Sequence, residues 1–180
     1  MNVNYMGFDT LIDPRAVIKR PHLMSIGSHC AIDACAYFTT KVEIGSYVHI
    51  GPYVTVIGGA ESELIVENFA TIATGVRIIC KGEEHLGWGL IGPTIPKNYS
   101  DRLVGGKVVI KQFANVSTNA VIFPGVTIGE GAVIGVNTVM HIDAEPWTIY
   151  FGNPVRKIKV RDSQKMLAYA SELMMRNRNV

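Results

Sequence analysis

One histidine lies on a long polar insertion, in a setting where its chemistry can be used. The insertion runs from Lys81 to Lys107 and carries His85 next to Glu83 and Glu84. Imidazole exchanges its proton near neutral pH, so a histidine beside a substrate hydroxyl or amine can remove that group's proton. Loops longer than about 12–15 residues are uncommon inside compact domains and are usually functional. His85 is therefore a candidate general base, with a solvated loop histidine as the alternative.

The same insertion supplies groups that suit a polar ring. Trp88 and Tyr99 offer aromatic faces on which a sugar can stack, and Glu84 offers a carboxylate for the substrate or for His85. His49 lies on a regular stretch of the chain and is the next candidate, as a groove residue or a second-choice base. No serine or cysteine motif indicates nucleophilic catalysis. We expect the remaining histidines to be surface residues without a role in catalysis or binding: His22, His29 and His141.

Outside the insertion, aliphatic residues recur with a period of six, and a smaller residue follows each of them four positions later. Internal repeats are sought before helices and strands, because a missed repeat leads to the wrong fold. A composition of 48% hydrophobic residues would fill such positions only about half of the time, so chance is a poor explanation. The main series comprises Ile26, Ile32, Phe38, Ile44, Ile50, Val56, Val66, Ile72, Ile78, Ile110, Val116, Ile122, Ile128, Ile134 and Met140.

A period of six fits neither an α-helix nor simple strand alternation. It fits a triangular solenoid in which each hexapeptide forms one flat side and the aliphatic residue points inward. Three hexapeptides then make one coil, and successive coils stack at the parallel-strand spacing of about 4.8 Å. We therefore predict an all-β parallel β-helix of roughly five coils over residues 1–160, with residues 81–107 as an extruded loop. The spacing alone leaves the hand of the coil open.

The end of the sequence changes character after Pro154. Basic residues follow at Arg156, Lys157 and Lys159, and residues 161–177 have the pattern of a helix. Asp162 or Ser163 can cap its start, and an apolar stripe runs along it. We predict a C-terminal helix and tail over residues 161–180, with the stripe as a packing or subunit surface. The stripe comprises Met166, Ala170, Leu173 and Met174.

Composition excludes several classes of function. The 180 residues include only 18% charged residues against 48% hydrophobic, which favours a folded domain over a disordered chain. A formal net charge of +2 is too small to indicate nucleic acid or a membrane surface as a partner. We expect no membrane insertion and no signal peptide. Three cysteines without a CxxC pair favour buried thiols in a reducing, cytoplasmic setting over metal or redox chemistry.

Two stretches carry a family resemblance. The segment IFPGVTIGEGAVIGVNTV from Ile122 and the segment YFGNPVRKI from Tyr150 resemble the hexapeptide acyltransferases, especially the sugar, galactoside and xenobiotic acetyltransferases. The resemblance covers the repeat from about Ile26 to Ile158. It implies a left-handed coil, a homotrimer, and active sites in the grooves between neighbouring subunits. It also implies that the extruded loop supplies a catalytic histidine, and His85 holds that position.

The resemblance further implies acetyl-CoA as the donor, with no metal. The family's CoA-contacting positions correspond here to Thr118, Val136 and Arg156, with Lys157 or Lys159 nearby for the 3′-phosphate. A sugar hydroxyl attacks a thioester only as a base removes its proton, and a backbone N–H at a coil corner can hold the oxyanion. The implied activity is transfer of an acetyl group to a hydroxyl or amino group of a sugar or sugar nucleotide.

Three alternatives remain at this point. The acceptor can instead be an antibiotic, as in the xenobiotic acetyltransferases. A γ-type carbonic anhydrase shares the fold but needs three histidine ligands, and the five histidines here show no suitably close pair. A non-catalytic scaffold is the third, and the long loop with its histidine and the basic tail argue against it.

Overall fold

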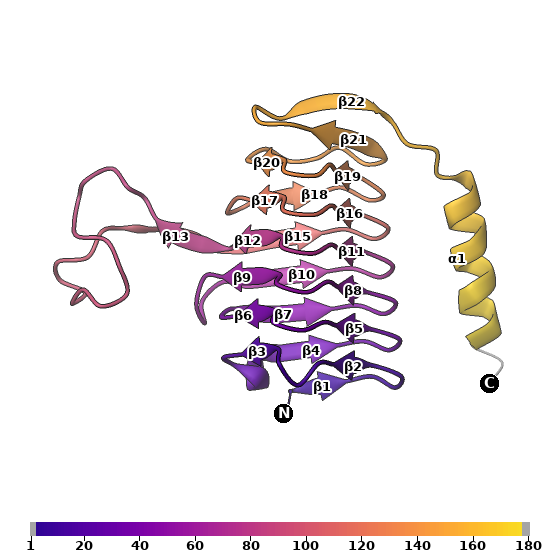
Figure 1. Cartoon of the computed structure of the whole chain (residues 1–180), viewed down its shortest axis with the longest axis horizontal. Coiled ribbons are helices and arrows are strands. Elements are labelled where there is room, and N and C mark those ends of the chain that lie inside the picture. Colours follow the sequence, from indigo (N-terminus) through magenta and orange to yellow (C-terminus); the bar gives the residue numbers. More distant parts are fainter. Residues whose placement is uncertain (1–2, 178–180) are drawn as a thin grey trace.

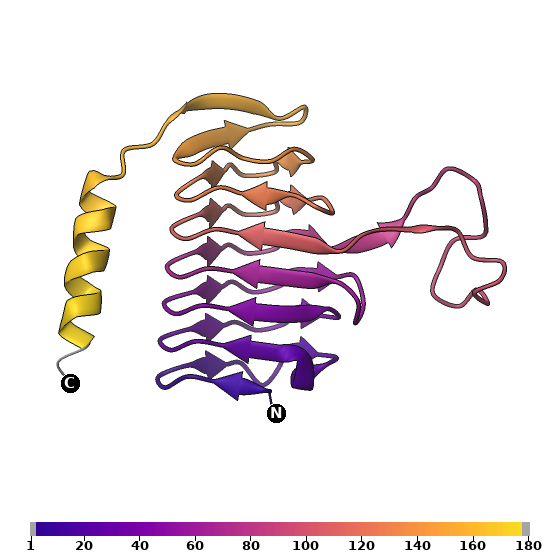
Figure 2. The same ribbon diagram turned by 180° about the vertical axis from the view of Figure 1, so that it is seen from behind.

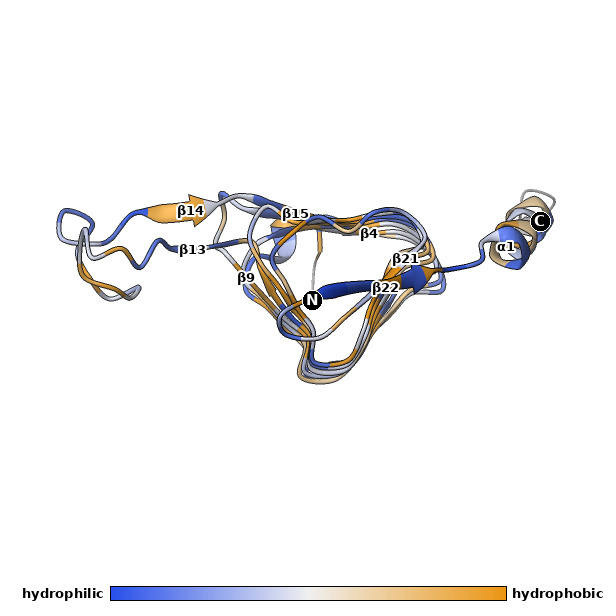
Figure 3. Cartoon of the chain, turned by 90° about the horizontal axis from the view of Figure 1, so that it is seen from above, coloured by the Kyte–Doolittle hydropathy of each residue, from blue (hydrophilic) through white to orange (hydrophobic). Residues whose placement is uncertain are grey.

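Short parallel strands stack into three sheets (Figure 1), which form the sides of a triangular solenoid (Figure 3). A computed structural model of the chain describes residues 3–177. Sheet A contains β1 (Tyr5–Met6), β4 (Met24–Ile26), β7 (Lys41–Ile44), β10 (Glu63–Val66), β15 (Lys107–Ile110) and β18 (Thr127–Ile128). Sheet B contains β2 (Leu11–Ile12), β5 (Ala31–Ile32), β8 (His49–Ile50), β11 (Thr71–Ile72), β16 (Asn115–Val116), β19 (Val133–Ile134), β21 (Thr148–Phe151) and β22 (Arg156–Val160). Sheet C contains β3 (Val17–Ile18), β6 (Tyr37–Phe38), β9 (Thr55–Ile57), β12 (Arg77–Ile79), β17 (Val121–Ile122) and β20 (Val139–Met140).

The six-residue period sets the core. Parallel pairing in register places Ile50 beside Ile32 on one side and Ile72 on the other, so like residues form columns along the inside of each sheet. Every residue of the main series predicted from the sequence is buried, with at most 6% of its surface exposed. Each such aliphatic side chain contributes about 1.5–3 kcal/mol on burial. The predicted parallel β-helix is confirmed.

The coil is left-handed. Seen from the C-terminal end of the solenoid, the chain runs from sheet A through sheet B to sheet C in a clockwise sense while it rises towards the viewer (Figure 3). The solenoid is also longer than predicted, because sheets A and C each contain six strands. The additional coil is the first one, formed by β1, β2 and β3, which pair in parallel with β4, β5 and β6. A short 3₁₀ helix, η1 (Pro21–Leu23), separates this coil from the next.

A stack of aromatic rings runs along the corner between sheets A and B. Its residues adopt positive φ angles of 52° to 61°, a backbone conformation that side chains other than glycine rarely adopt. Consecutive rings lie 4.6 to 5.9 Å apart. Gly131 occupies this corner in the coil between Phe113 and Trp147, and the Trp147 ring lies over it. Ring stacking compensates for the unfavourable backbone angle. The stack consists of His29, Tyr47, Phe69, Phe113 and Trp147.

The last strand turns back over the top of the solenoid. β22 pairs antiparallel with β21, and the Arg161 guanidinium then donates to the carbonyl oxygens of Phe113 and Gly131 at the aromatic corner. The helix α1 (Gln164–Asn177) follows and stands beyond that corner (Figures 1 and 2). It begins three residues later than predicted, because Asp162 accepts a hydrogen bond from the N–H of Gln164 and so marks the helix start. Within residues 3–177, no helix has the length and apolar character that a membrane crossing requires.

Candidate active site

The insertion forms an arm that projects from the corner between sheets C and A (Figures 1 and 3). We call residues 81–107 the arm. Its stem is an antiparallel ribbon in which β13 (Lys81–Glu83) pairs with β14 (Leu103–Gly105). The bonds continue outward, from the N–H of Glu84 to the carbonyl of Arg102 and between Leu90 and the segment 99–101. The arm is therefore an ordered extension of the solenoid that carries its side chains away from the core.

His85 lies just beyond the end of the stem, with φ of 60° and an exposed side chain. Its position is fixed through its backbone. The N–H of His85 donates to Oδ2 of Asp101 across the arm at 3.1 Å, and the N–H of Arg102 donates to Oδ1 of the same carboxylate at 2.8 Å. Asp101 is only 4% exposed, so this carboxylate is a buried clamp between the two sides of the arm. The His85 side chain is exposed, so a substrate can contact its imidazole.

The two glutamates beside His85 have different surroundings. Glu83 accepts a hydrogen bond from the N–H of Gly92 at 3.2 Å, which ties the stem to the tip of the arm. Glu84 has one carboxylate oxygen, Oε2, that is buried without a hydrogen-bond partner and lies 3.9 Å from Nε of Arg102. Within residues 3–177, neither glutamate bonds to the His85 ring. Glu84 therefore has one unsatisfied acceptor, which lies inside the arm beside Arg102.

The two aromatic candidates lie at the outer part of the arm. Trp88 is 71% exposed and Tyr99 is 62% exposed. His49 is in a different part of the molecule, on β8 of sheet B, where its Nε2 lies 2.8 Å from Asp33. The structure therefore keeps Trp88 and Tyr99 on the same arm as His85 but separates His49 from all three.

The predicted donor-binding residues fall into two places. Thr118 and Val136 lie on successive coils at the corner between sheets B and C, where the N–H of Asn137 bonds to the carbonyl of Thr118. Across the described chain, the backbone N–H groups of Thr118 and Val136 have no protein acceptor, so both remain open to a ligand. The second group of predicted donor-binding residues lies on β22 and comprises three exposed basic residues: Arg156, Lys157 and Lys159.

Lys157, the second residue of β22, is already paired. Nζ of Lys157 bonds to Oε2 of Glu145, and this bond raises the pKa of Lys157 above its usual value. No salt bridge joins Arg156 or Lys159 to an acid within the part of the chain that the structure describes, so these two cations are the more available for a phosphate. In the same part of the chain, no cluster of three or more histidine, cysteine, aspartate or glutamate residues could hold a metal ion.

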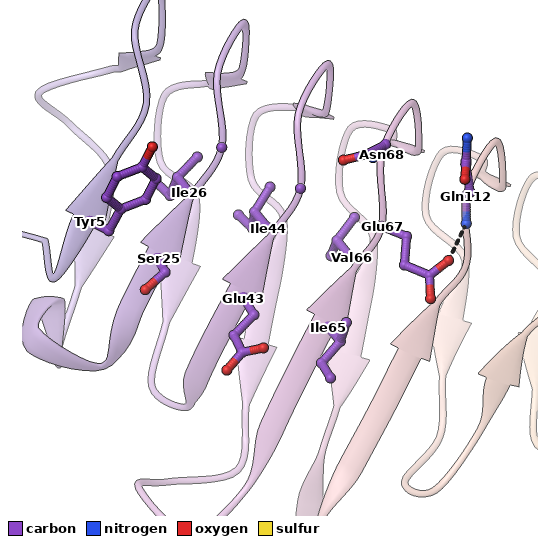
Figure 4. A pocket seen from close by; sticks show the side chains of 12 residues that line it. Tyr5, Ser25, Ile26, Glu43, Ile44, Ile65, Val66, Glu67, Asn68 and Gln112 are labelled. Carbon is purple, nitrogen blue, oxygen red and sulfur yellow. Dashed lines mark hydrogen bonds between the residues drawn. The ribbon is translucent and has the colours of Figure 1, made fainter. Parts of the chain in front are cut away.

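Two large hollows border the solenoid, and only one of them involves the arm. A groove of about 520 Å³ lies along the outer face of sheet A between Tyr5 and Gln112, and it contains no arm residue (Figure 4). A cleft of about 560 Å³ lies between the arm and the outer face of sheet C. Asp101 lines this second cleft and bonds to the backbone of His85, which connects the cleft with the candidate base. We call it the arm cleft.

Sequence reasoning did not single out Asp101. An aspartate on a polar loop is usually solvated, and its burial follows from the close approach of the two sides of the arm. A side chain at Gly89 would collide with the backbone of Ser100 and Asp101, so the glycine permits this approach. Gly89 and Asp101 lie on opposite sides of the arm, and only their contact in the folded arm buries Asp101. A sequence pattern does not reveal that contact.

Comparison with known proteins gives the family. Residues 24–58 match the model of the bacterial transferase hexapeptide family, six repeats. A single-residue variant of the N-acyltransferase AntD from Bacillus cereus, solved in complex with dTDP-4-amino-4,6-dideoxyglucose and coenzyme A, superimposes with a TM-score of 0.91. It is 34% identical, and the likeness covers 97% of this chain and 92% of AntD. The chain belongs to the hexapeptide-repeat acyltransferases. As a member of this family, it is an acyl-CoA-dependent transferase.

Two further relatives of this acyltransferase differ in their acceptors. The dTDP-4-amino-4,6-dideoxy-D-glucose acyltransferase of Escherichia coli is 28% identical over 95% of this chain and 88% of the relative. A probable macrolide acetyltransferase of Lysinibacillus sphaericus is 34% identical, but over 62% of this chain and 67% of the relative. The sugar-nucleotide enzymes therefore match nearly the whole chain, whereas the macrolide enzyme matches part of it.

Proposed function

We propose that this acyltransferase moves the acyl group of an acyl-CoA to the amino group of a nucleotide-linked 4-amino-4,6-dideoxyhexose. The likeness to AntD over 97% of the chain carries the proposal. The uncovered 3% amounts to about five residues, fewer than the 27 residues of the arm, so the match extends over most of the arm as well as the solenoid. The E. coli relative, whose name gives the same acceptor, supports it independently.

The proposed chemistry assigns one role to each group on the arm. The amino nitrogen of the sugar attacks the thioester carbonyl, a tetrahedral oxyanion forms, and its collapse expels CoA as a thiolate. His85 takes the proton from the attacking nitrogen and returns it to the departing sulfur. Glu84 helps to hold the acceptor beside His85, and a backbone N–H at a coil corner holds the oxyanion.

The donor lies along the solenoid in this proposal. The open N–H groups at Thr118 and Val136 bind the pantetheine amides, and Arg156 with Lys159 binds the 3′-phosphate. Lys157 contributes less, because Glu145 already neutralises it. Acetyl-CoA is the simplest donor that fits, and a thioester with a longer acyl chain uses the same contacts.

The proposed working form is a homotrimer in the cytoplasm. The arm exposes large apolar and aromatic side chains to solvent in the single chain, each at least 55% exposed: Leu86, Trp88, Leu90, Ile91, Tyr99 and Leu103. A neighbouring solenoid would cover them. His85 on the arm also lies at a different corner from Thr118 and Val136, which supports a site assembled from two subunits. The catalytic unit then comprises residues 1–160, with residues 161–180 as an appended helix and tail.

A thiol-release assay tests the proposal. The protein is incubated with acetyl-CoA and, in separate reactions, with dTDP-4-amino-4,6-dideoxyglucose, its 4-hydroxy counterpart, and the free amino sugar. We expect CoA release to be fastest by at least a hundredfold with the nucleotide-linked amino sugar. Faster release with the hydroxy counterpart would contradict N-acylation, and equal release with the free sugar would contradict recognition of the nucleotide.

An antibiotic acceptor is the second candidate, and the likeness to the macrolide acetyltransferase is the observation that favours it. The exposed aromatic side chains of Trp88 and Tyr99 would then pack against a large apolar ring. Chloramphenicol and a macrolide are therefore included in the same assay. A kcat/KM for either drug above that for the sugar nucleotide would favour this second function.

A further inference from the structure

The first coil forms the N-terminal end of the solenoid, and much of its apolar surface is exposed (Figure 1). We call this end, residues 3–20, the N-terminal face. Five of its large apolar residues are 42% to 73% exposed: Tyr5, Met6, Phe8, Leu11 and Val17. Extended apolar surface of this kind indicates an interaction site.

The same end leaves three strand edges open. Within residues 3–177, β1, β2 and β3 each pair with one strand only, which is β4, β5 or β6. The N–H groups of Leu11 and Asp13 donate to carbonyls of the second coil, so the N–H of Ile12 between them points away from that coil. The N–H groups on either side of Ile18 do the same, so the N–H of Ile18 also points outward. Such an edge is a template on which another strand can pair.

The C-terminal end of the solenoid is built differently. There β22 pairs antiparallel with β21, and it carries exposed basic residues that oppose the addition of a further strand. The strands of the N-terminal face contain no charged residue: Tyr5–Met6, Leu11–Ile12 and Val17–Ile18. The N-terminal face is therefore the end that suits a second chain.

The open edges of the N-terminal face lie on the three sides of one triangle (Figure 3). A single added peptide strand covers one edge, whereas a second solenoid turned upside down presents three edges on the same triangle. A two-fold axis through the middle of sheet B reverses every strand, and it pairs β2 with the partner's β2 and β1 with the partner's β3, all antiparallel. We propose that the N-terminal face is an interface at which two copies of the chain meet end to end.

Charges at two corners complement each other under this axis. The axis sets the corner between sheets A and B of one copy against the corner between sheets B and C of the other. Asp9 lies at the first corner with its side chain 73% exposed, and Arg15 lies at the second with its side chain 70% exposed. Asp9 of each copy therefore faces Arg15 of the partner subunit. Within the chain, Asp9 bonds to His29 and Arg15 to Asp13, and both keep exposed surface for a second contact.

The third corner brings like charges together, and contacts within the chain draw them aside. Lys19 and Arg20 lie at the corner between sheets C and A, which the axis sets against the same corner of the partner. Nζ of Lys19 lies 5.9 Å from the centre of the Tyr37 ring, and the Arg20 guanidinium donates to the carbonyl of Thr39. Tyr37 and Thr39 belong to the second coil, so both cations reach away from the N-terminal face.

End-to-end pairing leaves the candidate active site open. The arm and β22 belong to later coils and lie away from the N-terminal face (Figures 1 and 2). In the proposed homotrimer, three N-terminal faces point the same way, so the pairing joins two trimers into a hexamer. The inference uses the trimer only for this count of chains and is independent of the acceptor.

Sedimentation equilibrium of the full-length chain at micromolar concentrations tests the inference. We expect six chains per particle for the unmodified protein. Phe8→Lys and Leu11→Lys each place like charges from both copies in the interface, and each should raise the dissociation constant of the two halves by at least about tenfold. Tyr169→Lys is the matched control, because Tyr169 on α1 is 68% exposed, as Phe8 is, and it should leave the hexamer intact. Thermal unfolding shows whether each variant is folded.

A charge exchange tests the two-fold axis itself. Asp9→Arg and Arg15→Asp each place like charges at the facing corners, so each should weaken the pairing. The variant with both substitutions restores opposite charges there and should recover most of the lost affinity. The two residues lie at different corners of the same coil, so this recovery comes only from contacts between copies.

The outcomes separate this inference from the proposed homotrimer and from its chemistry, which the thiol-release assay tests. Particles of three chains would overturn the inference and leave the homotrimer standing. Particles of two chains that Phe8→Lys splits would support the N-terminal interface and contradict the trimer. Particles of single chains would contradict both. A hexamer that Phe8→Lys and Leu11→Lys leave intact would place the interface elsewhere and overturn the inference.

Discussion

The carboxylate of Asp101 gives the most informative single substitution on the arm. It is 4% exposed and accepts two backbone hydrogen bonds, from His85 at 3.1 Å and from Arg102 at 2.8 Å. Asp101→Asn keeps the shape but removes the charge and replaces one acceptor oxygen by an NH₂ group. One of the two N–H groups then faces a donor and loses its partner.

The magnitude follows from these contacts. A hydrogen bond to a charged group contributes about 1.5–3 kcal/mol, and water can replace the partner of His85 because that residue is exposed. We therefore take the lower figure, about 1.5 kcal/mol, which corresponds to a roughly tenfold fall in the equilibrium constant for ordering of the arm. The core coils do not use Asp101, so the midpoint of global unfolding should change little.

Steady-state kinetics of Asp101→Asn with the amino sugar nucleotide should then show kcat/KM reduced by at most about tenfold, with the KM for acyl-CoA unchanged. His85→Ala should cost more, about 10²–10⁴-fold, because it removes the base itself. The positioning role would be refuted if Asp101→Asn lowered kcat as much as His85→Ala or more. Asp101 would then act on the acceptor directly, and the imidazole would not be the base.

Other predictions concern the base, the donor, the fold and the thiols. His85→Ala should lower kcat by about 10²–10⁴-fold and leave acyl-CoA affinity nearly unchanged, and a variant that keeps more than half of kcat would exclude His85 as the base. Arg156→Ala should remove most of the difference in KM between acetyl-CoA and its dephospho form, and equal KM values in the unmodified enzyme would contradict the phosphate assignment. Phe113→Ala should reduce the free energy of unfolding in urea by about 3–5 kcal/mol, because Phe113 is 5% exposed within the ring stack; a loss below 1 kcal/mol would show that the stack contributes little. Burial raises the pKa of Cys80 to about 12, so at pH 8 iodoacetamide should modify the exposed Cys35 in the folded protein but not Cys80, and rapid labelling of Cys80 would contradict its burial.

The solenoid was predictable because its core is periodic in the sequence. Each side of a coil must place an aliphatic side chain in the interior, and this requirement appears in the sequence as an aliphatic residue at every sixth position. The first coil was missed although Met6, Ile12 and Ile18 keep the same period. The turn at η1 shifts the phase by two residues before Ile26, and the interior of a terminal coil is less well covered, with Met6 at 49% exposed.

Other features depend on contacts between residues that are far apart in the sequence, and the sequence pattern does not predict these contacts. β22 is a basic, exposed strand over residues 156–160, and only its pairing with β21 makes it a strand. The aromatic stack places large residues at positive φ, a conformation that glycine and asparagine adopt more readily. The arm was predictable as an insertion, but its internal clamp was not. Asp101 lies 16 residues from His85, and the ribbon that joins them has few strand-like residues.

The candidate site was predictable only in part. The sequence indicates His85 from its place on the insertion, and the structure holds its backbone in a defined position on an ordered arm. The role of Glu84 stays a prediction, because its unpaired oxygen is buried inside the arm. The residues of the arm cleft come from β6, β9 and the arm, so their convergence depends on the coil geometry and on the angle of the arm. Tyr37 is a strand residue with no distinguishing neighbour in the sequence.

The identity of the acylated atom tests the central claim most directly. The enzyme is incubated with acetyl-CoA and dTDP-4-amino-4,6-dideoxyglucose, and the product is isolated and examined by NMR. The account predicts an amide at the 4-amino nitrogen of the intact sugar nucleotide, formed in proportion to the CoA released. An ester on a sugar hydroxyl, or CoA release without an acylated sugar nucleotide, would contradict it.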